Sequence, residues 1–258
     1  MENQDYLKKS KHYGLSFYKV MITENTDEAY LVAQELVENL FFLLSKQCTK
    51  FCNKDFYMPP YMFSERRLDS VVLPALAKIC DSIVMTELPV NRKIGNDNYQ
   101  GRADYWCIYK GYSFVIELKH SKDHYETPNT RKHAIVERWR KMLKQLNSVK
   151  KEILEFEENT KGVIRLGLHM VSSFSPKYLE DAPKFDAKKI EEIAKRLQKD
   201  LTGKSTKNHP DMLLCWKIPS AIVKSGDEKG FWLYPGLWTI AKIYPPLIHE
   251  GATNNANH

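Results

Sequence analysis

A twenty-residue stretch, GRADYWCIYKGYSFVIELKH at positions 101–120, constrains the fold of this chain more than any other part of it. Its two halves are rich in aromatic and β-branched residues, which favour strands, and Lys110 and Gly111 stand between them as a two-residue turn. With this turn, Tyr109 pairs with Tyr112, and the register of the whole ladder follows from that pair. The sequence therefore predicts a β-hairpin over this stretch.

The predicted hairpin carries three charged side chains on one face. Counting back from the turn places Asp104 opposite Glu117, and Lys119 shares their face because side chains alternate along a strand. Directly opposed residues have Cβ atoms ~4.5–5.5 Å apart, where like charges repel each other. A hard divalent cation with oxygen ligands, Mg²⁺ or Mn²⁺, relieves this repulsion, so the face predicts a metal site. Lys119 suits charge stabilisation or deprotonation of an attacking water. Its charge state is open, because burial lowers the pKa of a lysine while carboxylates raise it.

An aspartate followed, across a turn, by Glu-x-Lys at the end of an apolar strand resembles the motif of the PD-(D/E)XK nuclease superfamily. That superfamily has the restriction-endonuclease-like fold and cleaves phosphodiester bonds with metal ions. The resemblance implies that Asp104 and Glu117 bind one or two Mg²⁺ or Mn²⁺ ions, with the Leu118 carbonyl as a further ligand. It also implies that Lys119 orients or activates water and offsets charge on the phosphate. Ala103 departs from the proline of the family motif, but the ligand is the aspartate after it.

The run Gly-Arg-Ala-Asp at 101–104 is similar to the Gly-x-x-Asp form of the RecB-like branch of this superfamily. We expect Arg102, beside the aspartate, to contact nucleic acid. The triplet [DE]-x-K is weak by itself, since it occurs again at 186–188 and 227–229, but only the first copy ends an apolar strand. The alternative is an ordinary hairpin with charged residues at its solvated rim. A register shift of one residue would also move Asp104 to the other face.

A helix is predicted to begin at Ser64, a favourable N-cap residue, and Glu65 falls on its buried stripe. The apolar positions of that helix are Leu68, Val71, Val72, Ala75, Leu76 and Ile79. A buried glutamate is costly without a partner. In the resembled superfamily, a glutamate of the helix before the sheet often joins the metal site, and Glu65 matches that placement. The helix dipole, which favours a glutamate in the first turn, explains the same residue equally well. Asp69 is expected in solvent, and Pro74 predicts a kink or a break.

A long basic helix with one apolar seam is predicted over residues 131–158. Arg138, Lys141 and Gln145 fall together on one flank of the seam, as candidates for contact with nucleic acid. In the RecB-like branch, a glutamine of this helix lies near the active site and a tyrosine follows four residues later. Here the later residue is Val149, so a solvated flank is the favoured interpretation for Gln145. A solvated face and a track for phosphates both explain the basic residues.

The remaining predicted elements complete an α/β fold. They are a strand or docked arm within 1–25, a helix over 25–47, loops over 48–62, 91–100 and 120–130, strands over 82–90, 162–173, 212–218 and 231–243, and a helix over 186–201. From 63 to 174 the order α-β-β-β-α-β is that of a restriction-endonuclease-like core, with a central mixed sheet flanked by helices. We expect one nuclease-like domain whose parts are an N-terminal arm and helix at 1–62, a catalytic core at 63–174, a β-rich extension at 175–245 and a disordered tail at 246–258.

Composition favours a polyanionic partner in a reducing compartment. The chain of 258 residues has 39 Lys and Arg against 32 Asp and Glu, a net charge of +7 that favours nucleic acid, with DNA expected. Its five cysteines are scattered, and the close pair Cys48 and Cys52 fits one helix face better than a zinc site. No apolar run reaches the length of a membrane span, so we expect no membrane partner and a cytoplasmic protein, or a nuclear one in a eukaryote. The histidines at 120, 124 and 133 match no metal motif and are expected at the surface.

Two other classes of function stay open. One is a nucleic-acid-binding module of the same fold that does not cleave and serves as a scaffold or as a subunit of a larger complex. The other is a protein–protein adaptor whose charged hairpin is incidental, which predicts no metal binding. The sequence does not distinguish DNA from RNA or endonuclease from exonuclease. Because restriction-type members often work as dimers, a homodimer or a partner protein also stays open.

Overall fold

The computed structural model describes residues 8–12, 15–53, 60–62, 64–80, 84–94, 97–124, 132–149, 160–175, 186–202, 208–218, 222–224 and 231–248. Within these ranges the helices are α1 (Glu28–Asn53), α2 (Glu65–Ile79), α3 (Lys132–Asn147) and α4 (Ala187–Thr202), with a short 3₁₀ helix at Pro60–Met62. The strands are β1 (Lys8–His12), β2 (Leu15–Met21), β3 (Met85–Ile94), β4 (Asp97–Tyr109), β5 (Tyr112–His124), β6 (Val163–Ser175), β7 (Met212–Lys217), β8 (Ile222–Lys224) and β9 (Phe231–Ile243).

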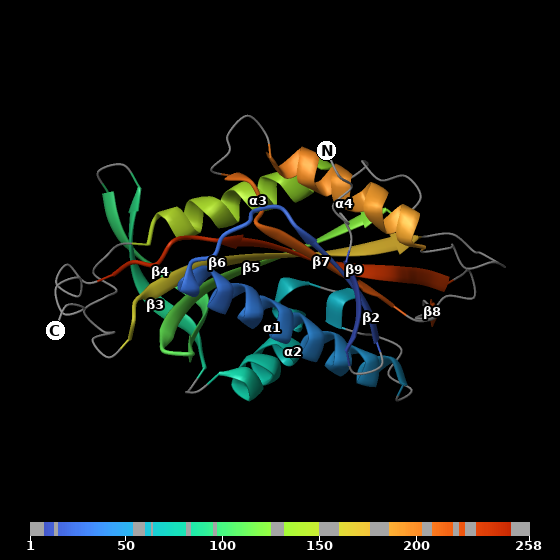
Figure 1. The fold of residues 1–258 in the computed structure, drawn as a ribbon, viewed down its shortest axis with the longest axis horizontal. Coiled ribbons are helices and arrows are strands. Elements are labelled where there is room, and N and C mark those ends of the chain that lie inside the picture. The colour runs from blue at the N-terminus through green and yellow to red at the C-terminus, as the bar shows by residue number, and fades with distance from the viewer. Residues whose placement is uncertain are drawn as a thin grey trace.

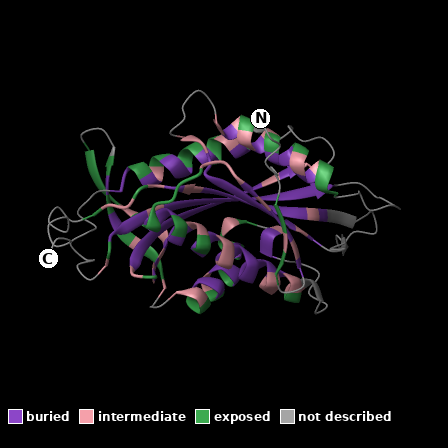
Figure 2. Cartoon of the chain, in the orientation of Figure 1, coloured by how far each residue is buried: buried purple, intermediate pink, exposed green. Residues whose placement is uncertain are grey.

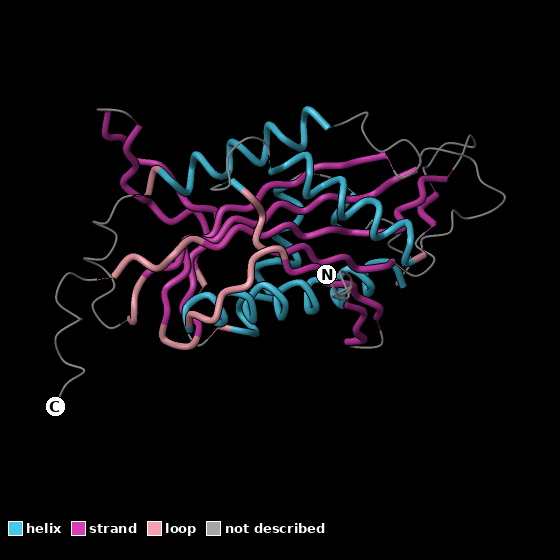
Figure 3. Tube along the Cα trace, turned by 45° about the horizontal axis from the view of Figure 1, so that its top comes forward, coloured by secondary structure: helices cyan, strands magenta, loops and turns pink. Residues whose placement is uncertain are grey.

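These strands form one mixed sheet between two layers of helices (Figure 1). Their order across the sheet is β1-β2-β7-β9-β6-β5-β4-β3, and β8 pairs with β9 beside this path. The helices α3 and α4 cover one face and α1 and α2 the other, and the same layering is visible in the tilted view of Figure 3. The predicted α/β class with a central mixed sheet is therefore confirmed.

The parallel pair β5–β6 is the pair nearest to the predicted site. Neighbouring parallel strands need a crossover connection, and α3 supplies it between the end of β5 and the start of β6. The pair runs in register from Ser113 with Val163 to His124 with Phe174. Along the chain, α2-β3-β4-β5-α3-β6 reproduces the expected α-β-β-β-α-β order over 63–174.

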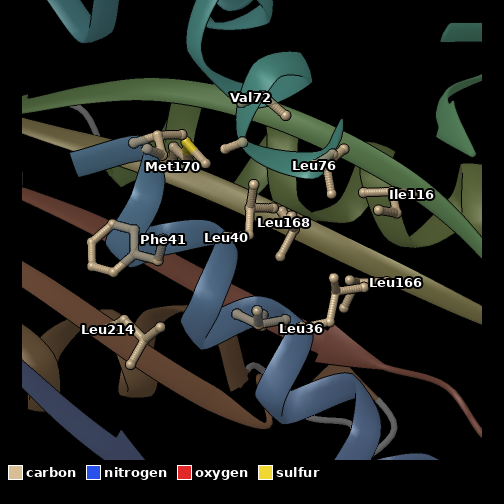
Figure 4. Packing of buried hydrophobic residues seen from close by; sticks show 14 of the residues in the cluster. Leu36, Leu40, Phe41, Val72, Leu76, Ile116, Leu166, Leu168, Met170 and Leu214 are labelled. Carbon is tan, nitrogen blue, oxygen red and sulfur yellow. The ribbon is translucent and has the colours of Figure 1, made fainter. Parts of the chain in front are cut away.

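Alternating side chains divide the interior into two main apolar cores, one on each face of the sheet. On β7, Met212, Leu214 and Trp216 belong to the cluster with α1 and α2, whereas Leu213 and Cys215 belong to the cluster with α3 and α4. Figure 4 shows part of the first cluster, in which side chains of α1 and α2 meet those of β5, β6 and β7. Figure 2 shows that the central strands are buried throughout most of their length, as expected for a sheet covered on both faces.

Gly167 of β6 allows α3 to pack closely against the sheet. A Cβ atom at this position would lie 2.6 Å from Met142 Cε and 2.9 Å from Leu146 Cδ1, both side chains of α3. Gly167 pairs with Glu117 in the β5–β6 ladder. The missing side chain thus brings the end of α3 close to the predicted catalytic strand.

Two predicted loops are wrong because main-chain pairing extends β3, β4 and β5 into polar sequence. The stretch 91–100 is mostly strand, since β3 and β4 form an antiparallel hairpin out to Ile94 and Asp97. In the stretch 120–130, β5 continues to His124 alongside β6, and the remainder lies outside the described residues. Ladder hydrogen bonds use backbone groups, so a polar strand at the edge of a sheet or over a cavity leaves little trace in the hydrophobic pattern.

The boundaries of two helices also differ from prediction. α3 ends at Asn147, and Val149 instead forms an isolated bridge with Arg92, so the helix predicted over 131–158 is wrong at its C-terminal end as far as the described residues reach. α1 runs on to Asn53 through the predicted loop at 48–62, and Cys48 is buried within it. Its apolar face continues against the sheet past residue 47, which keeps the helix intact.

The helix predicted to begin at Ser64 is present as Glu65–Ile79, and it continues through Pro74 without a break. Ser64 stands at its N-cap position, but its side chain makes no capping hydrogen bond. Asp69 is exposed as expected, although the Tyr105 hydroxyl donates a hydrogen bond to it. The helix predicted at 186–201 and the two strands predicted after it are also found, with small shifts at their ends, and the short β8 between those strands was not predicted.

Both ends of the described chain join the sheet. β1 and β2 form a hairpin at one edge, where β2 pairs with β7, so the N-terminal segment is a docked arm. Leu247 bridges Val163 through two main-chain hydrogen bonds of 2.8 and 2.9 Å, so the predicted tail begins as an ordered segment. The part of the tail from 249 onward lies outside the described residues, as does the Gly203-Lys204-Ser205 loop.

None of the helices in the described ranges is both long and apolar enough to cross a bilayer.

Candidate active site

The central hairpin has the predicted turn and register. Lys110 and Gly111 both have positive φ angles, 49° and 78°, as a type I′ turn requires. Tyr109 pairs with Tyr112, and the ladder continues to the pair Tyr105 and Ile116. The regular pairing ends there, one position short of Asp104 and Glu117, and the Asp104 carboxylate accepts a hydrogen bond from the Leu118 amide of the facing strand.

The Lys119 ammonium lies among three carboxylates at this point. Its Nζ atom is 3.2 Å from Glu65 Oε1, 3.4 Å from Asp104 Oδ2 and 4.0 Å from Glu117 Oε2. It also donates a hydrogen bond of 2.7 Å to the carbonyl oxygen of Leu118. The structure therefore brings together all five residues that the sequence proposed for catalysis and metal binding, from α2, β4 and β5.

Main-chain groups of β5 hold two of these carboxylates in place. The Leu118 amide donates to Asp104 Oδ2 over 2.7 Å, and the His120 amide donates to Glu65 Oε2 over 3.1 Å. Glu65 thus uses one oxygen for a backbone amide and the other for Lys119. These contacts fix the first turn of α2 over the end of β5, so Glu65 does more than interact with the helix dipole.

Glu117 is fully buried and pairs with Arg92, a residue that sequence reasoning missed. The Arg92 side chain is 2% exposed and donates a hydrogen bond to Glu117 Oε1. It also donates to the carbonyl of Arg102 over 2.6 Å, to Ser148 Oγ over 3.3 Å and to the carbonyl of Gln145. One guanidinium therefore links β3, β4, β5 and the C-terminal end of α3. The sequence predicted a polar loop around Arg92, and for that reason it did not identify this arginine as a buried partner of Glu117.

Gly101 makes room for this arginine. A Cβ atom on Gly101 would lie 2.3 Å from Arg92 Nε and 2.5 Å from its Cδ, which is too close for the two to coexist. The glycine of the run at 101–104 thus has a steric reason in this chain. Arg92 pairs with Tyr99 and Gly101 with Val90, so an arginine diagonal to a glycine across an antiparallel pair is the sequence feature that could have revealed the contact.

Burial and mutual charge shift the titration of this cluster. Burial, followed by the charge of Asp104, raises the pKa of Glu117 to about 7 against the opposing effect of Arg92 and Lys119. Burial alone lowers the pKa of Lys119, but Asp104, Glu65 and Glu117 outweigh that effect, and the pKa is raised. The charge state left open by the sequence is thereby decided: Lys119 carries its proton at neutral pH.

The residues fit a hard divalent cation. Glu117 Oε2 is buried and has no hydrogen-bond partner among the described residues. The Lys119 ammonium near this oxygen also contacts oxygens of Asp104 and Glu65 and the Leu118 carbonyl, the ligand type that Mg²⁺ and Mn²⁺ prefer. In the described ranges, no three acidic, histidine or cysteine side chains already converge as a metal-binding group. In this arrangement, the Lys119 ammonium lies between the carboxylates that would have to converge.

A cavity of about 690 Å³ opens over this cluster, between the first turn of α2, the end of β5 and α3. Its lining includes Glu65 and Lys119 from the cluster and Arg138, Lys141 and Gln145 from α3. The structure thus places the predicted flank of α3 at the site. Gln145 is only partly exposed and its buried Oε1 has no partner among the described residues, so a fully solvated flank is wrong for it.

Arg102 is the one predicted residue whose side chain lies apart. It is largely exposed, pairs with Glu87 at 3.4 Å and does not line the cavity. Arg138, in contrast, donates to the His120 carbonyl at the cavity wall. Arg102 shares a face of β4 with Asp104, but it lies two residues further along the strand, where its side chain pairs with Glu87 of β3.

His120 lines the cavity and is buried, so its predicted surface position is wrong, whereas His133 on α3 is exposed. His120 Nε2 lies 3.0 Å from Ser172 Oγ, and a second buried histidine, His169, has Nε2 2.8 Å from Ser121 Oγ. Burial lowers the pKa of His120 to about 4 and that of His169 to about 3, with nearby cations adding to both shifts. Both imidazoles are therefore neutral at pH 7.

We expect this histidine pair to make the fold sensitive to mild acid. An unfolded histidine has a pKa near 6.5, so below pH 6.5 the unfolded chain binds more protons than the folded one and stability falls. At pH 4.5, two pH units lower, His169 alone should cost about 2.5 kcal/mol of the free energy of unfolding. Urea unfolding at pH 7.5, 6.0 and 4.5 measures the decline. His169→Gln should flatten it and His133→Gln should not; equal slopes for both variants would show that His169 is not held neutral.

Comparison with known proteins gives no further guidance: no family model, no curated protein and no solved structure matches this chain.

Proposed function

We propose that this protein is a metal-dependent nuclease that hydrolyses phosphodiester bonds in nucleic acid, with DNA as the expected substrate. The observation that carries the proposal is the lysine ammonium set among three carboxylates and a main-chain carbonyl, on the wall of an open cavity lined by cations. A lysine beside converging carboxylates supplies both a metal site and a positive charge for a phosphoryl group.

The arrangement of elements supports the same proposal. The α2-β3-β4-β5-α3-β6 order agrees with a restriction-endonuclease-like core, which we propose as the fold of residues 63–174. Asp104 and Glu117 lie on the central hairpin. α2 adds Glu65 from one side of the cavity, and α3 adds the basic residues Arg138 and Lys141 from the other. The agreement of separate features of the chain favours a nuclease over an incidental charged hairpin.

Asp104, Glu117, Glu65 and the Leu118 carbonyl are the groups that would hold one or two Mg²⁺ or Mn²⁺ ions. A bound ion polarises the scissile phosphate and lowers the pKa of water. Among these groups, Glu117 has one oxygen fixed by Arg92, which leaves only Oε2 available for an ion.

The chain's own cations perform the remaining tasks. Because Lys119 keeps its proton, we assign it to charge stabilisation: its Nζ–H groups donate to phosphate oxygens as negative charge develops in the transition state. Arg138 and Lys141 line the same cavity and bind the flanking phosphates of the strand. Gln145 offers an amide to the same strand from the next turn of α3.

A cleavage assay tests the proposal. The protein is incubated with supercoiled plasmid, linear duplex, single-stranded DNA and RNA, with Mg²⁺, Mn²⁺ or EDTA. We expect cutting that needs the metal and is lost in Asp104→Asn, which removes the charge but keeps the shape. Metal binding is measured in parallel by calorimetry. If the protein cuts none of these substrates and also binds no metal, the nuclease is excluded and the non-cleaving binding module is favoured.

A further inference from the structure

A second cavity, of about 390 Å³, lies on the other flank of α3. Its walls carry three basic side chains, Lys93 from the end of β3 and Arg140 and Lys144 from α3. The remaining lining residues are Leu143, Asn147, Ser148 and Asn208. At 100° per residue, Arg140 and Lys144 point on average about 130° away from Arg138 and Gln145, so the helix separates this cavity from the candidate active site.

The three cations converge without a compensating carboxylate. No acidic residue lines the cavity, and within the described ranges none of the three forms an ion pair. Like charges brought together from two elements repel each other, and each would gain from a bound anion. The amide groups of Asn147 and Asn208 add neutral donors of the kind that complete phosphate sites.

The C-terminal end of α3 does not account for these cations. Free carbonyls at a helix end attract positive charge, but here other groups already use them. The Lys144 carbonyl accepts from the Ser148 amide over 3.1 Å, and the Gln145 carbonyl accepts from Arg92. The Leu146 carbonyl accepts from the Val149 amide over 3.3 Å. Lys93, Arg140 and Lys144 are therefore available for a ligand.

The backbone around the cavity is fixed by hydrogen bonds. The Lys93 amide donates to the Ser148 carbonyl over 2.9 Å, which joins the end of β3 to the end of α3. Trp139 Nε1 donates to the Asn208 carbonyl over 3.0 Å, which ties the opposite wall to the same helix. The three walls thus keep their positions without a ligand, so little ordering is needed when an anion binds.

We propose that this cavity binds a backbone phosphate of a nucleic acid strand whose scissile phosphate lies in the candidate active site. The inference rests on the proposed function for the choice of nucleic acid among phosphate-bearing ligands. An α-helix with its side chains is about 10–12 Å across, so a strand that crosses the outer face of α3 must span about that width between the two cavities. Phosphate contacts of this kind set register and affinity and carry no sequence information.

The test compares two triple variants that remove the same charge. Lys93→Gln, Arg140→Gln and Lys144→Gln together empty the cavity of cations, and Lys8→Gln, Lys50→Gln and Lys78→Gln remove exposed lysines from β1, α1 and α2. Binding of fluorescent oligonucleotides is measured in EDTA, so that no strand is cut, across a range of salt concentrations. Circular dichroism checks that both variants fold.

We expect the cavity variant to bind at least tenfold more weakly than the wild type. The slope of log K against log salt should fall by about 0.9 for duplex DNA or about 0.7 for a single strand, the value of one phosphate contact. The control variant should change both quantities much less. Equal losses in the two variants, or no nucleic-acid binding by the wild type, would overturn the inference.

A second arm separates a strand phosphate from a free anion. Inorganic phosphate and pyrophosphate are titrated into the wild type and the cavity variant by calorimetry. If the cavity variant no longer binds the free anions but binds oligonucleotides as the wild type does, the cavity is a site for a free anion and not for a phosphate of a nucleic acid strand. The proposed nuclease activity is judged separately: cutting with no effect of the cavity variant refutes this inference alone, and a cavity effect without cutting refutes the catalysis alone.

Discussion

Lys119→Met should abolish cleavage and yet strengthen metal binding. The substitution removes the ammonium that offsets charge on the phosphate, an effect typically worth 10²–10³-fold in rate. It also removes the cation that lies 3.2–4.0 Å from three carboxylate groups and competes with a metal ion for them. We therefore expect metal-dependent cutting to fall at least 10²-fold and the Mn²⁺ dissociation constant to fall several-fold. Single-turnover cleavage and calorimetry in EDTA-treated buffer measure the two effects.

Lys242→Met is the matched control for that variant. Lys242, on β9, is another largely buried lysine, and its Nζ atom lies 3.2 Å from Asp211 Oδ1. It does not line the cavity of the candidate active site. Its loss should lower the free energy of unfolding while cutting and metal affinity stay near the wild-type values. If Lys119→Met instead bound Mn²⁺ more weakly, the carboxylates would not form the metal site. If it cut normally, the lysine would have no part in the chemistry.

Arg92→Met should lower the free energy of unfolding by about 3–5 kcal/mol at pH 8. Breaking a buried ion pair at one partner leaves the other charge in a low-dielectric interior, and losses of that size are typical. Arg92 also satisfies two main-chain carbonyls and a serine hydroxyl, which would lose their donor. Urea unfolding of the variant and the wild type under the same buffers gives the difference.

This loss should shrink as the pH falls. The pKa of Glu117 is raised to about 7 even with Arg92 present, and removal of the guanidinium raises it further. A folded pKa above the unfolded value of about 4.5 means that the folded state holds the proton more tightly, so stability is lost as the pH rises through the folded pKa. At pH 5.5 the variant can protonate Glu117, and the difference from the wild type should be smaller than at pH 8.

Two further variants make the interpretation specific to the Glu117 contact. Arg165 is a half-buried arginine; it donates to the Leu146 carbonyl of α3 over 3.5 Å and stacks on Tyr244, with no carboxylate partner among the described residues. Arg165→Met should therefore cost less and show no comparable pH dependence. Gly101→Ala should mimic Arg92→Met in direction, because the new Cβ would displace the guanidinium stem. A pH-independent loss in Arg92→Met would argue against the ion pair.

Through Arg92, the strand that carries Glu117 is joined by hydrogen bonds to the helix that lines both cavities. Arg92 contacts Glu117 at one end and the carbonyl of Gln145 and Ser148 Oγ at the other. Ser148 in turn lines the second cavity. A nucleic acid strand bound across α3 would therefore contact the same hydrogen-bonded residues that position Glu117, the proposed metal ligand.

Much of the site could be predicted because it is local in sequence. A two-residue turn at Lys110 and Gly111 determines the register of one hairpin, and that register brings Asp104 and Glu117 to the same Lys119 ammonium. The crossover from β5 through α3 to β6 was also predictable, since a parallel pair with a long connection needs a helix. The amphipathic pattern of the last helix was equally sufficient to identify its buried face.

The remaining parts depended on contacts between segments far apart in the chain. Glu65 had two equal explanations until the amide of His120 and the ammonium of Lys119 were found at its oxygens. Arg92 lies in a polar stretch with no hydrophobic period, and only the pairing of β3 with β4 directs its side chain into the interior while the neighbouring residues stay exposed. The carboxylates of three elements decided the charge of Lys119 against the effect of burial, and tertiary packing decided the buried position of His120. Local backbone geometry is encoded in neighbouring residues, whereas burial and charge pairing depend on which distant elements pack together, and the tertiary structure decides that.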